Sequence, residues 1–135
     1  MSEWDELYRE EILEHYQHPR HRGTLELPDF TYEDANPLCG DRVRVDVKVA
    51  DGRIADVGFS GHGCAISQAA TSMLCERVFG MPLDEVKRLT REDMLEMLGI
   101  ELGPVRLKCA LLGLKTLKAG VYGINQWPGE EDDTP

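Results

Sequence analysis

Three cysteines and one aspartate in this chain have the types and local settings of metal ligands. They occur in three separate segments, Cys39-Gly40-Asp41, Gly61-His62-Gly63-Cys64 and Lys108-Cys109. Thiolates bind zinc and iron strongly, whereas a carboxylate is a harder ligand that exchanges more readily than a fourth thiolate would. Together these residues predict a site for one soft metal ion or a small iron–sulfur cluster. A site with such a donor set suits transient occupancy.

Glycines beside the candidate ligands indicate how the backbone could present them. Gly40 allows a tight turn between Cys39 and Asp41, which would share one face of a regular strand. Gly61 and Gly63 permit a positive φ angle or a close approach of another segment. Flexible flanks of this kind favour a site that can open.

Other candidates for metal binding are weaker. Cys75 falls within a helical pattern without a partner motif, which indicates a buried structural thiol. His62 could bind metal or exchange with Asp41, but a loop histidine more often lies at the surface. A purely structural zinc ion is the main alternative for the whole site, since such an ion contributes roughly 10–16 kcal/mol of apparent binding free energy in finger peptides. Structural sites usually avoid carboxylates, and a chain of this length can build its own core.

The apolar pattern predicts a sheet that would carry the first two segments. Valines alternate with polar residues over 43–49, which predicts a strand with a wet face formed by Arg42, Arg44, Asp46 and Lys48. Asp51-Gly52 favours a tight hairpin into a returning strand that contains Ile54, Val57 and Phe59. A further strand is expected around residues 30–34, after a polar surface connection over 18–23. The result is an antiparallel meander.

Helical spacing predicts the remaining elements. A first helix ends before Pro19, and further helices are expected over 66–78, 83–89, 92–98 and from Pro104 to Gly120. Cys64 would therefore lie at a junction between a strand and a helix, and Cys109 within the opening turns of the last helix. We expect an α+β protein with one domain over residues 1–124 and an acidic, disordered tail over 125–135.

Charge and hydropathy exclude several classes of function. The chain has 25 acidic and 15 basic residues and a formal net charge of −10, so it lacks the basic surface that nucleic-acid binding requires. Its apolar runs are too short to span a bilayer, and its N-terminus is acidic where a signal peptide would be basic. We expect a cytoplasmic protein that binds neither nucleic acid nor membrane.

Three blocks around the cysteines resemble the signature blocks of the iron–sulfur cluster assembly proteins IscU and SufU, from the NifU-like N-terminal family. They are Asn36-Pro37-Leu38-Cys39-Gly40-Asp41, Gly61-His62-Gly63-Cys64-Ala65-Ile66-Ser67 and Arg106-Leu107-Lys108-Cys109-Ala110. The resemblance implies a three-stranded antiparallel sheet with helices packed mainly on one face. It also implies that Cys39, Asp41, Cys64 and Cys109 bind the metal or cluster.

The resemblance implies two kinds of activity. As a scaffold, the protein would take sulfur from a cysteine desulfurase, assemble a transient [2Fe-2S] cluster and pass it to an apo-protein. As a zinc-dependent sulfurtransferase, it would be an enzyme that holds Zn²⁺ as isolated and relays persulfide sulfur to another scaffold, with Cys39 as the sulfur acceptor. Three thiolates and a carboxylate would leave excess negative charge around zinc, which makes Arg106 and Lys108 candidates to offset it.

Three details distinguish this chain from one or the other branch of the family. Lys108 precedes the third cysteine, as in SufU proteins, where IscU proteins usually have histidine. The interval between Cys64 and Cys109 is nevertheless too short for the long insertion that is typical of SufU. The segment Leu102-Gly103-Pro104-Val105-Arg106 has glycine where the chaperone-binding segment of IscU has its first proline, so we do not expect recruitment of an Hsp70-type chaperone.

Overall fold

The computed structural model describes residues 3–37, 40–123 and 127–128. The ligand candidate Cys39 and most of the predicted acidic tail, residues 125–126 and 129–135, lie outside this part of the chain. The elements, in chain order, are α1 (Glu3–Gln17), β1 (Phe30–Asn36), β2 (Asp41–Ala50), β3 (Arg53–His62), α2 (Ala65–Val78), α3 (Leu83–Lys87), α4 (Arg91–Leu98) and α5 (Pro104–Tyr122).

The three strands form an antiparallel sheet in the order β1-β2-β3, which confirms the predicted meander. Asp51 and Gly52 join β2 to β3 with φ angles of 55° and 72°, the positive values that a two-residue hairpin turn requires. The register places Asn36 opposite Asp41 and Arg42 opposite His62. One end of the sheet therefore carries Asn36, Asp41 and the start of the connection to α2.

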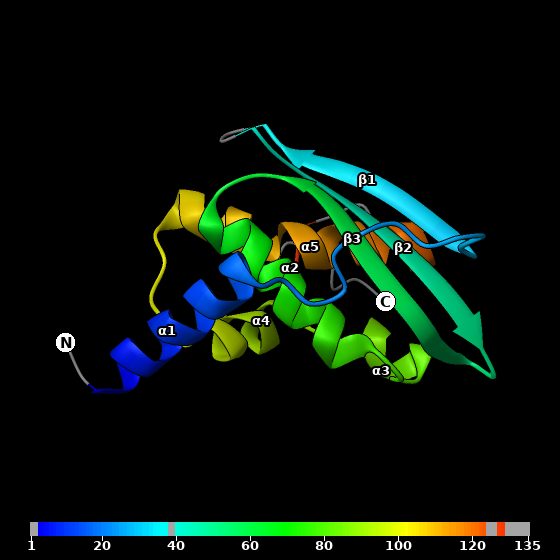
Figure 1. Ribbon diagram of the computed structural model, residues 1–135, viewed down its shortest axis with the longest axis horizontal. Helices are drawn as coiled ribbons and strands as arrows, with labels where there is room; N and C mark the ends of the chain where they lie inside the picture. The colour runs from blue at the N-terminus through cyan, green and yellow to red at the C-terminus, as the bar shows by residue number, and fades with distance from the viewer. Residues whose placement is uncertain (1–2, 38–39, 124–126, 129–135) are drawn as a thin grey trace, which may run out of the picture.

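The five helices of the described residues lie on one side of the sheet (Figure 1), as the family resemblance implied. The inner sheet face contributes Val43, Val45, Val47, Val57 and Phe59, each at most 3% exposed, to a core shared with α2 and α5. Burial of these side chains is the main force that holds α2 and α5 against the sheet. The core thus fixes α2, which follows Cys64, and α5, which contains Cys109, against the sheet.

Three helix ends differ from the predicted ones by one or two residues. Thr90 and Asp93 form a reciprocal capping box at the start of α4, so this helix begins one residue before the expected range. Helix α3 ends at Lys87 instead of Leu89. The prediction that the last helix ends at Gly120 is wrong, since α5 continues to Tyr122 and its cap is Gly123, with a left-handed φ of 72°.

The prediction that Asp46 faces water is wrong. Asp46 is 1% exposed, because the connection between α1 and β1 crosses the outer face of the sheet. Its carboxylate accepts hydrogen bonds from the Leu25 backbone N–H at 3.0 Å, from the Thr31 hydroxyl at 3.0 Å and from Nε of Arg44 at 3.1 Å. The connection also bonds the edge of β3, where Gly23 N–H donates to the Phe59 carbonyl. The buried carboxylate of Asp46 therefore accepts hydrogen bonds from three donors.

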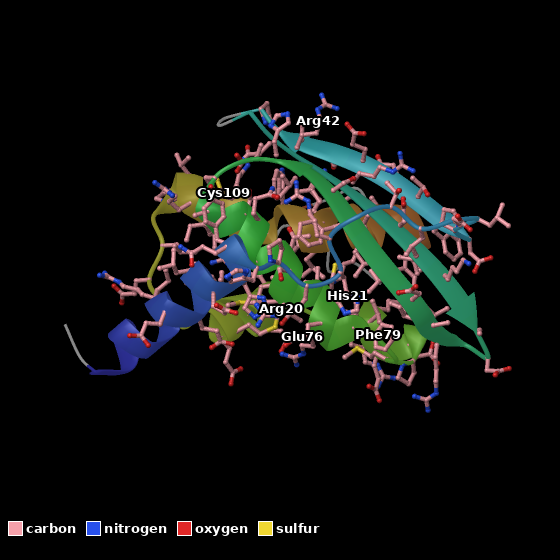
Figure 2. All side chains as sticks on the ribbon, viewed as in Figure 1. Arg20, His21, Arg42, Glu76, Phe79 and Cys109 are labelled. Atoms are coloured by element: carbon pink, nitrogen blue, oxygen red, sulfur yellow. The ribbon has the colours of Figure 1, made fainter. Side chains whose placement is uncertain are left out.

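The connection is also fastened to α2. Arg20 lies 3.7 Å from the carboxylate of Glu76, and the His21 ring is 5.1 Å from the Phe79 ring (Figure 2). The Ser72 hydroxyl oxygen accepts a hydrogen bond from the Arg20 backbone N–H and lies 2.8 Å from Nδ1 of His15, which is 4% exposed. His15 thus packs between α1 and α2.

Burial lowers the pKa of His15 below its ordinary value of 6.5, and the neighbouring Arg20 charge acts in the same direction. The carboxylates of Glu76, Glu11 and Glu14 oppose this shift but do not reverse it. Since the unfolded chain binds a proton at His15 more readily than the folded chain, acid favours unfolding. The contribution of His15 to stability is present above the unfolded pKa and is lost as the pH falls through the lowered pKa of the folded state.

We expect the urea midpoint of metal-free His15→Gln to depend less steeply on pH than that of the parent between about pH 7.5 and about pH 5. Chemical unfolding at several pH values measures the difference between the two proteins. His18→Gln is the matched control, because His18 is exposed at the same helix end. A slope for His15→Gln equal to that of the parent contradicts the assignment.

In the part of the chain that the structure describes, no helix is both long enough and apolar enough to cross a membrane.

Cys75 is 1% exposed within α2, and burial raises the pKa of its thiol to about 12. The prediction of a buried structural thiol at this position is confirmed.

Candidate metal centre

Asp41, Cys64 and Cys109 converge at one end of the sheet. One potential ligand atom from each residue lies within 4.8 Å of the other two. Asp41 begins β2, Cys64 precedes α2 and Cys109 lies in the second turn of α5. Asp41 and Cys109 are 3% and 1% exposed, whereas Cys64 is partly exposed. The folded core thus assembles a group that is distant in sequence and open to solvent on the side of Cys64.

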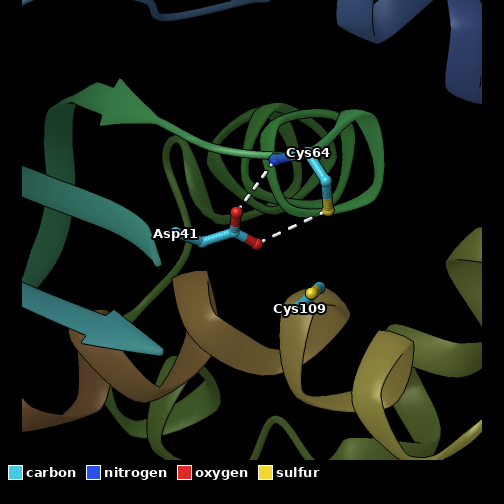
Figure 3. Close-up of side chains that lie close together, drawn as sticks. All are labelled: Asp41, Cys64 and Cys109. Atoms are coloured by element: carbon cyan, nitrogen blue, oxygen red, sulfur yellow. Dashed lines mark hydrogen bonds between the residues drawn. The ribbon is translucent and has the colours of Figure 1, made fainter. Parts of the chain in front are cut away.

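The carboxylate of Asp41 is oriented by Cys64 (Figure 3). Its Oδ1 atom accepts a hydrogen bond from the Cys64 backbone N–H at 2.9 Å. Its Oδ2 atom accepts a longer one from the Cys64 thiol, with a distance of 3.4 Å between Sγ and oxygen. One carboxylate oxygen is therefore engaged by the backbone, and the other faces the sulfur atoms.

Cys64 is the N-cap residue of α2. Its Sγ atom accepts a hydrogen bond from the Ser67 backbone N–H at 3.5 Å, and the Ser67 hydroxyl donates to the Cys64 carbonyl at 3.1 Å. A helix N-terminus carries a partial positive charge that favours an anion there. The sulfur atom of Cys64 is therefore held at the N-terminus of α2 by the Ser67 backbone N–H.

Gly63 allows β2 and α2 to meet closely. A Cβ atom at this position would lie 2.6 Å from Oδ1 of Asp41 and 2.6 Å from the Ser67 hydroxyl oxygen. Both distances are shorter than real carbon contacts, so only glycine fits without displacement of these groups. The predicted role of Gly63 in close approach is confirmed.

Cys109 meets the sheet through Asn36. The side-chain Nδ2 atom of Asn36 donates toward Sγ of Cys109 across 3.9 Å, and Asn36 is completely buried. Sequence reasoning did not identify Asn36 or Ser67 as site residues, although both stand in the quoted blocks. The available signal for Ser67 was its spacing, since the residue three after a cap is a usual hydrogen-bond partner.

The remaining residues predicted for the site, His62, Arg106 and Lys108, are not part of the Asp-Cys-Cys group within the described ranges. His62 is exposed, and within the described ranges it is not part of the Asp-Cys-Cys group. Arg106 is exposed in the first turn of α5. The Lys108 ammonium lies 5.0 Å from the centre of the Trp127 ring, and the Lys115 ammonium lies 5.2 Å from it. Lys108 is thus engaged with an aromatic ring, a contact that the sequence pattern did not predict.

A second unexpected feature is the carboxamide of Gln68, one helical turn after Cys64. Gln68 is 4% exposed, and neither its Nε2 nor its Oε1 atom has a hydrogen-bond partner among the described residues. Unpaired buried amides are uncommon because desolvation is not offset. The Gln68 carboxamide is therefore a buried polar group next to the start of α2.

The donor set fits Zn²⁺. Two sulfur atoms and one carboxylate oxygen are atom types that zinc binds, and two thiolates bound to one tetrahedral zinc ion at about 2.3 Å lie roughly 3.8 Å apart. The potential ligand atoms lie within 4.8 Å of one another, so small side-chain shifts would bring them to that spacing. A metal ion bound here would replace the thiol proton that Cys64 directs toward Asp41.

Comparison with known proteins gives a consistent result. The sequence profile of the family described as NifU-like N terminal domain matches residues 7–130. The chain is 32% identical to the zinc-dependent sulfurtransferase SufU of Bacillus subtilis over 134 residues, which cover 87% of this chain and 90% of that protein. It is 38% identical to the iron-sulfur cluster assembly scaffold protein IscU of Aquifex aeolicus over 128 residues, which cover 92% and 81%.

Crystal structures of related proteins have a similar fold. The crystal structure of a nitrogen-fixing NifU-like protein (N-terminal) from Brucella abortus superposes with a TM-score of 0.72 at 25% sequence identity. The match covers 91% of this chain and 97% of that one. The arrangement of sheet and helices is therefore shared along nearly the whole length.

Proposed function

This chain belongs to the family of NifU-like N terminal domains, and we propose that it acts in iron–sulfur cluster assembly as a scaffold for a transient [2Fe-2S] cluster. The observation that carries this proposal is the convergence of Asp41, Cys64 and Cys109 from three distant segments. Cys39 would supply the fourth ligand, on the evidence of its sequence block alone. Iron and sulfur are cargo in this function, supplied by other proteins and passed on to an apo-protein.

The site geometry supports release of the cargo. Asp41 is the one oxygen donor of the described group, and its exchange with solvent or with an incoming thiolate is easier than that of a cysteine. Cys64, its neighbour, is partly exposed, so an acceptor can approach from that side. An exchangeable carboxylate beside a partly exposed cysteine gives a site that holds a cluster and still lets it leave.

A zinc-dependent sulfurtransferase is the second candidate. It is supported by the similarity to SufU and by Lys108, which stands where IscU proteins usually have histidine. Zn²⁺, when bound by Cys39, Asp41, Cys64 and Cys109, would keep the thiols deprotonated. The Cys39 thiolate would then attack the outer sulfur of the desulfurase persulfide, form a new S–S bond and release the desulfurase cysteine as a thiolate. Arg106 and Lys108 are candidates to offset the negative charge of the site.

A single set of assays separates the two functions. The zinc-loaded protein is incubated with a cysteine desulfurase and cysteine in the absence of iron, and turnover is measured. A parallel reaction contains the metal-free protein, the same desulfurase and cysteine, ferrous iron and dithiothreitol, which supplies the electrons that reduce persulfide sulfur to sulfide. Strong stimulation without iron favours the sulfurtransferase, and a chromophore that moves to apo-ferredoxin favours the scaffold. Failure of both reactions contradicts the proposed function.

Asp41→Ala is expected to slow transfer of an assembled cluster about tenfold, which corresponds to about 1.4 kcal/mol of additional barrier. The reason is the loss of the exchangeable oxygen donor. Transfer is followed by circular dichroism with apo-ferredoxin as acceptor. Glu33→Ala is the control, because it removes an exposed carboxylate from β1. Equal transfer rates for Asp41→Ala and the parent count against the role of Asp41.

A further inference from the structure

We propose that Asn36 is a positioning residue for Cys109, whose sulfur atom accepts a hydrogen bond from the Asn36 carboxamide. This inference rests on the proposed function, because it concerns Cys109 as a ligand of the metal or cluster. Asn36 would have two effects on Cys109. Its carboxamide would fix the direction of the Cys109 sulfur atom, and its hydrogen bond would withdraw electron density from that sulfur atom.

Asn36 connects the segments that build the site. It is the last residue of β1 and lies opposite Asp41 in the sheet register. Its backbone carbonyl accepts a hydrogen bond from the Gly40 N–H at 2.9 Å. Its side chain reaches Cys109, which lies 73 residues later in the sequence. One residue therefore couples the turn before Asp41 to the start of α5.

Burial gives this contact its weight. Asn36 is 0% exposed and Cys109 is 1% exposed, so water does not compete for either group. The distance of 3.9 Å between Nδ2 and Sγ is long but within the range of hydrogen bonds to the large sulfur atom. A metal-bound thiolate is an acceptor without a proton, so only the NH₂ end of the carboxamide can face it favourably.

The chemistry of the contact predicts a spectroscopic effect. A hydrogen bond to a thiolate stabilises its lone pairs, and a charge-transfer transition from sulfur to metal then needs more energy. Groups that support metal ligands in this way typically change metal affinity by roughly 10- to 100-fold when they are removed. A residue that only fills space would not shift the transition.

Co²⁺ is the probe, because its sulfur charge-transfer bands report on bound thiolates. The parent, Asn36→Ala and Asn36→Asp are titrated with Co²⁺, and affinity is measured by competition with a chelator. Asp34→Ala is the matched control, since Asp34 lies on the same strand and makes an ion pair with Lys115 of α5. Thermal unfolding of each metal-free protein confirms that it is folded.

We expect Asn36→Ala to shift the charge-transfer band to longer wavelength and to weaken Co²⁺ binding roughly 10-fold or more. Asn36→Asp should weaken it further, because a carboxylate cannot donate and adds a like charge. If the charge-transfer band of Asn36→Ala lies at the parent's wavelength, the inference is overturned. This holds if Asn36→Ala binds Co²⁺ as the parent does, and also if its affinity falls by the same factor as that of Asp34→Ala. A parent protein that shows no sulfur-to-cobalt band contradicts the proposed metal site itself, which distinguishes the two failures.

Discussion

Cys109→Ala is expected to weaken Zn²⁺ binding by more than the roughly 100-fold that follows from loss of a residue supporting a ligand. The reason is that this substitution removes a ligand from a site whose buried side depends on Cys109. Competition of the purified variant with a chromophoric zinc chelator measures the affinity. Retention of the parent affinity would show that the Asp-Cys-Cys group is not the metal site.

The chain provides a matched control for this experiment. Cys75→Ala removes a thiol of the same type and the same burial from α2, and Cys75 is not part of the converging group. We expect Cys75→Ala to bind Zn²⁺ as the parent does, even if the small cavity in the core lowers its unfolding temperature. Equal affinity losses in both variants would indicate a general effect of core packing on the site.

Gly63→Ala is expected to disrupt the site without removal of a ligand. The added Cβ would overlap the Asp41 carboxylate and the Ser67 hydroxyl, each at 2.6 Å, so at least one of them must move. Overpacking of this kind typically costs about 1–3 kcal/mol of folding stability. We expect a loss of that size in urea unfolding of the metal-free protein and at least roughly 10-fold weaker Zn²⁺ binding.

Gly103→Ala is the corresponding control. A Cβ at Gly103 would meet no atom within 4 Å, and the φ angle of −71° is ordinary for alanine. Because Gly103 is the N-cap of α5, a stability loss of up to about 1 kcal/mol is expected there, with Zn²⁺ affinity unchanged. If Gly63→Ala binds Zn²⁺ as tightly as Gly103→Ala, the contact between Gly63 and Asp41 does not shape the site.

Local patterns predicted most of the secondary structure. The alternating valines of β2, the Asp51-Gly52 turn and the Thr90 cap each depend on residues that are neighbours in sequence. The burial of Asp46 could not be predicted in this way, because the segment that covers it has no regular pattern of its own. The spacing of apolar residues identifies helices and strands, and it gives no information about where an irregular connection such as that between α1 and β1 will lie.

The candidate site was predictable in part for a similar reason. Asp41, Cys64 and Cys109 stood out by residue type, and the structure places them together. Asn36 did not stand out, since an asparagine before a proline is first interpreted as a turn residue. Its contact with Cys109 depends on how β1 and α5 pack, which sequence spacing alone does not reveal. Trp127 was missed for the same reason.

The position of Cys109 near the start of the last helix has a consequence for biosynthesis. An unfinished chain that ends before α5 contains Asp41 and Cys64 but lacks both Cys109 and the helix that packs on β1 and α2. Nascent polypeptides therefore cannot offer the complete ligand group to passing ions. The complete candidate ligand group therefore forms only after the last helix has been synthesised and packed.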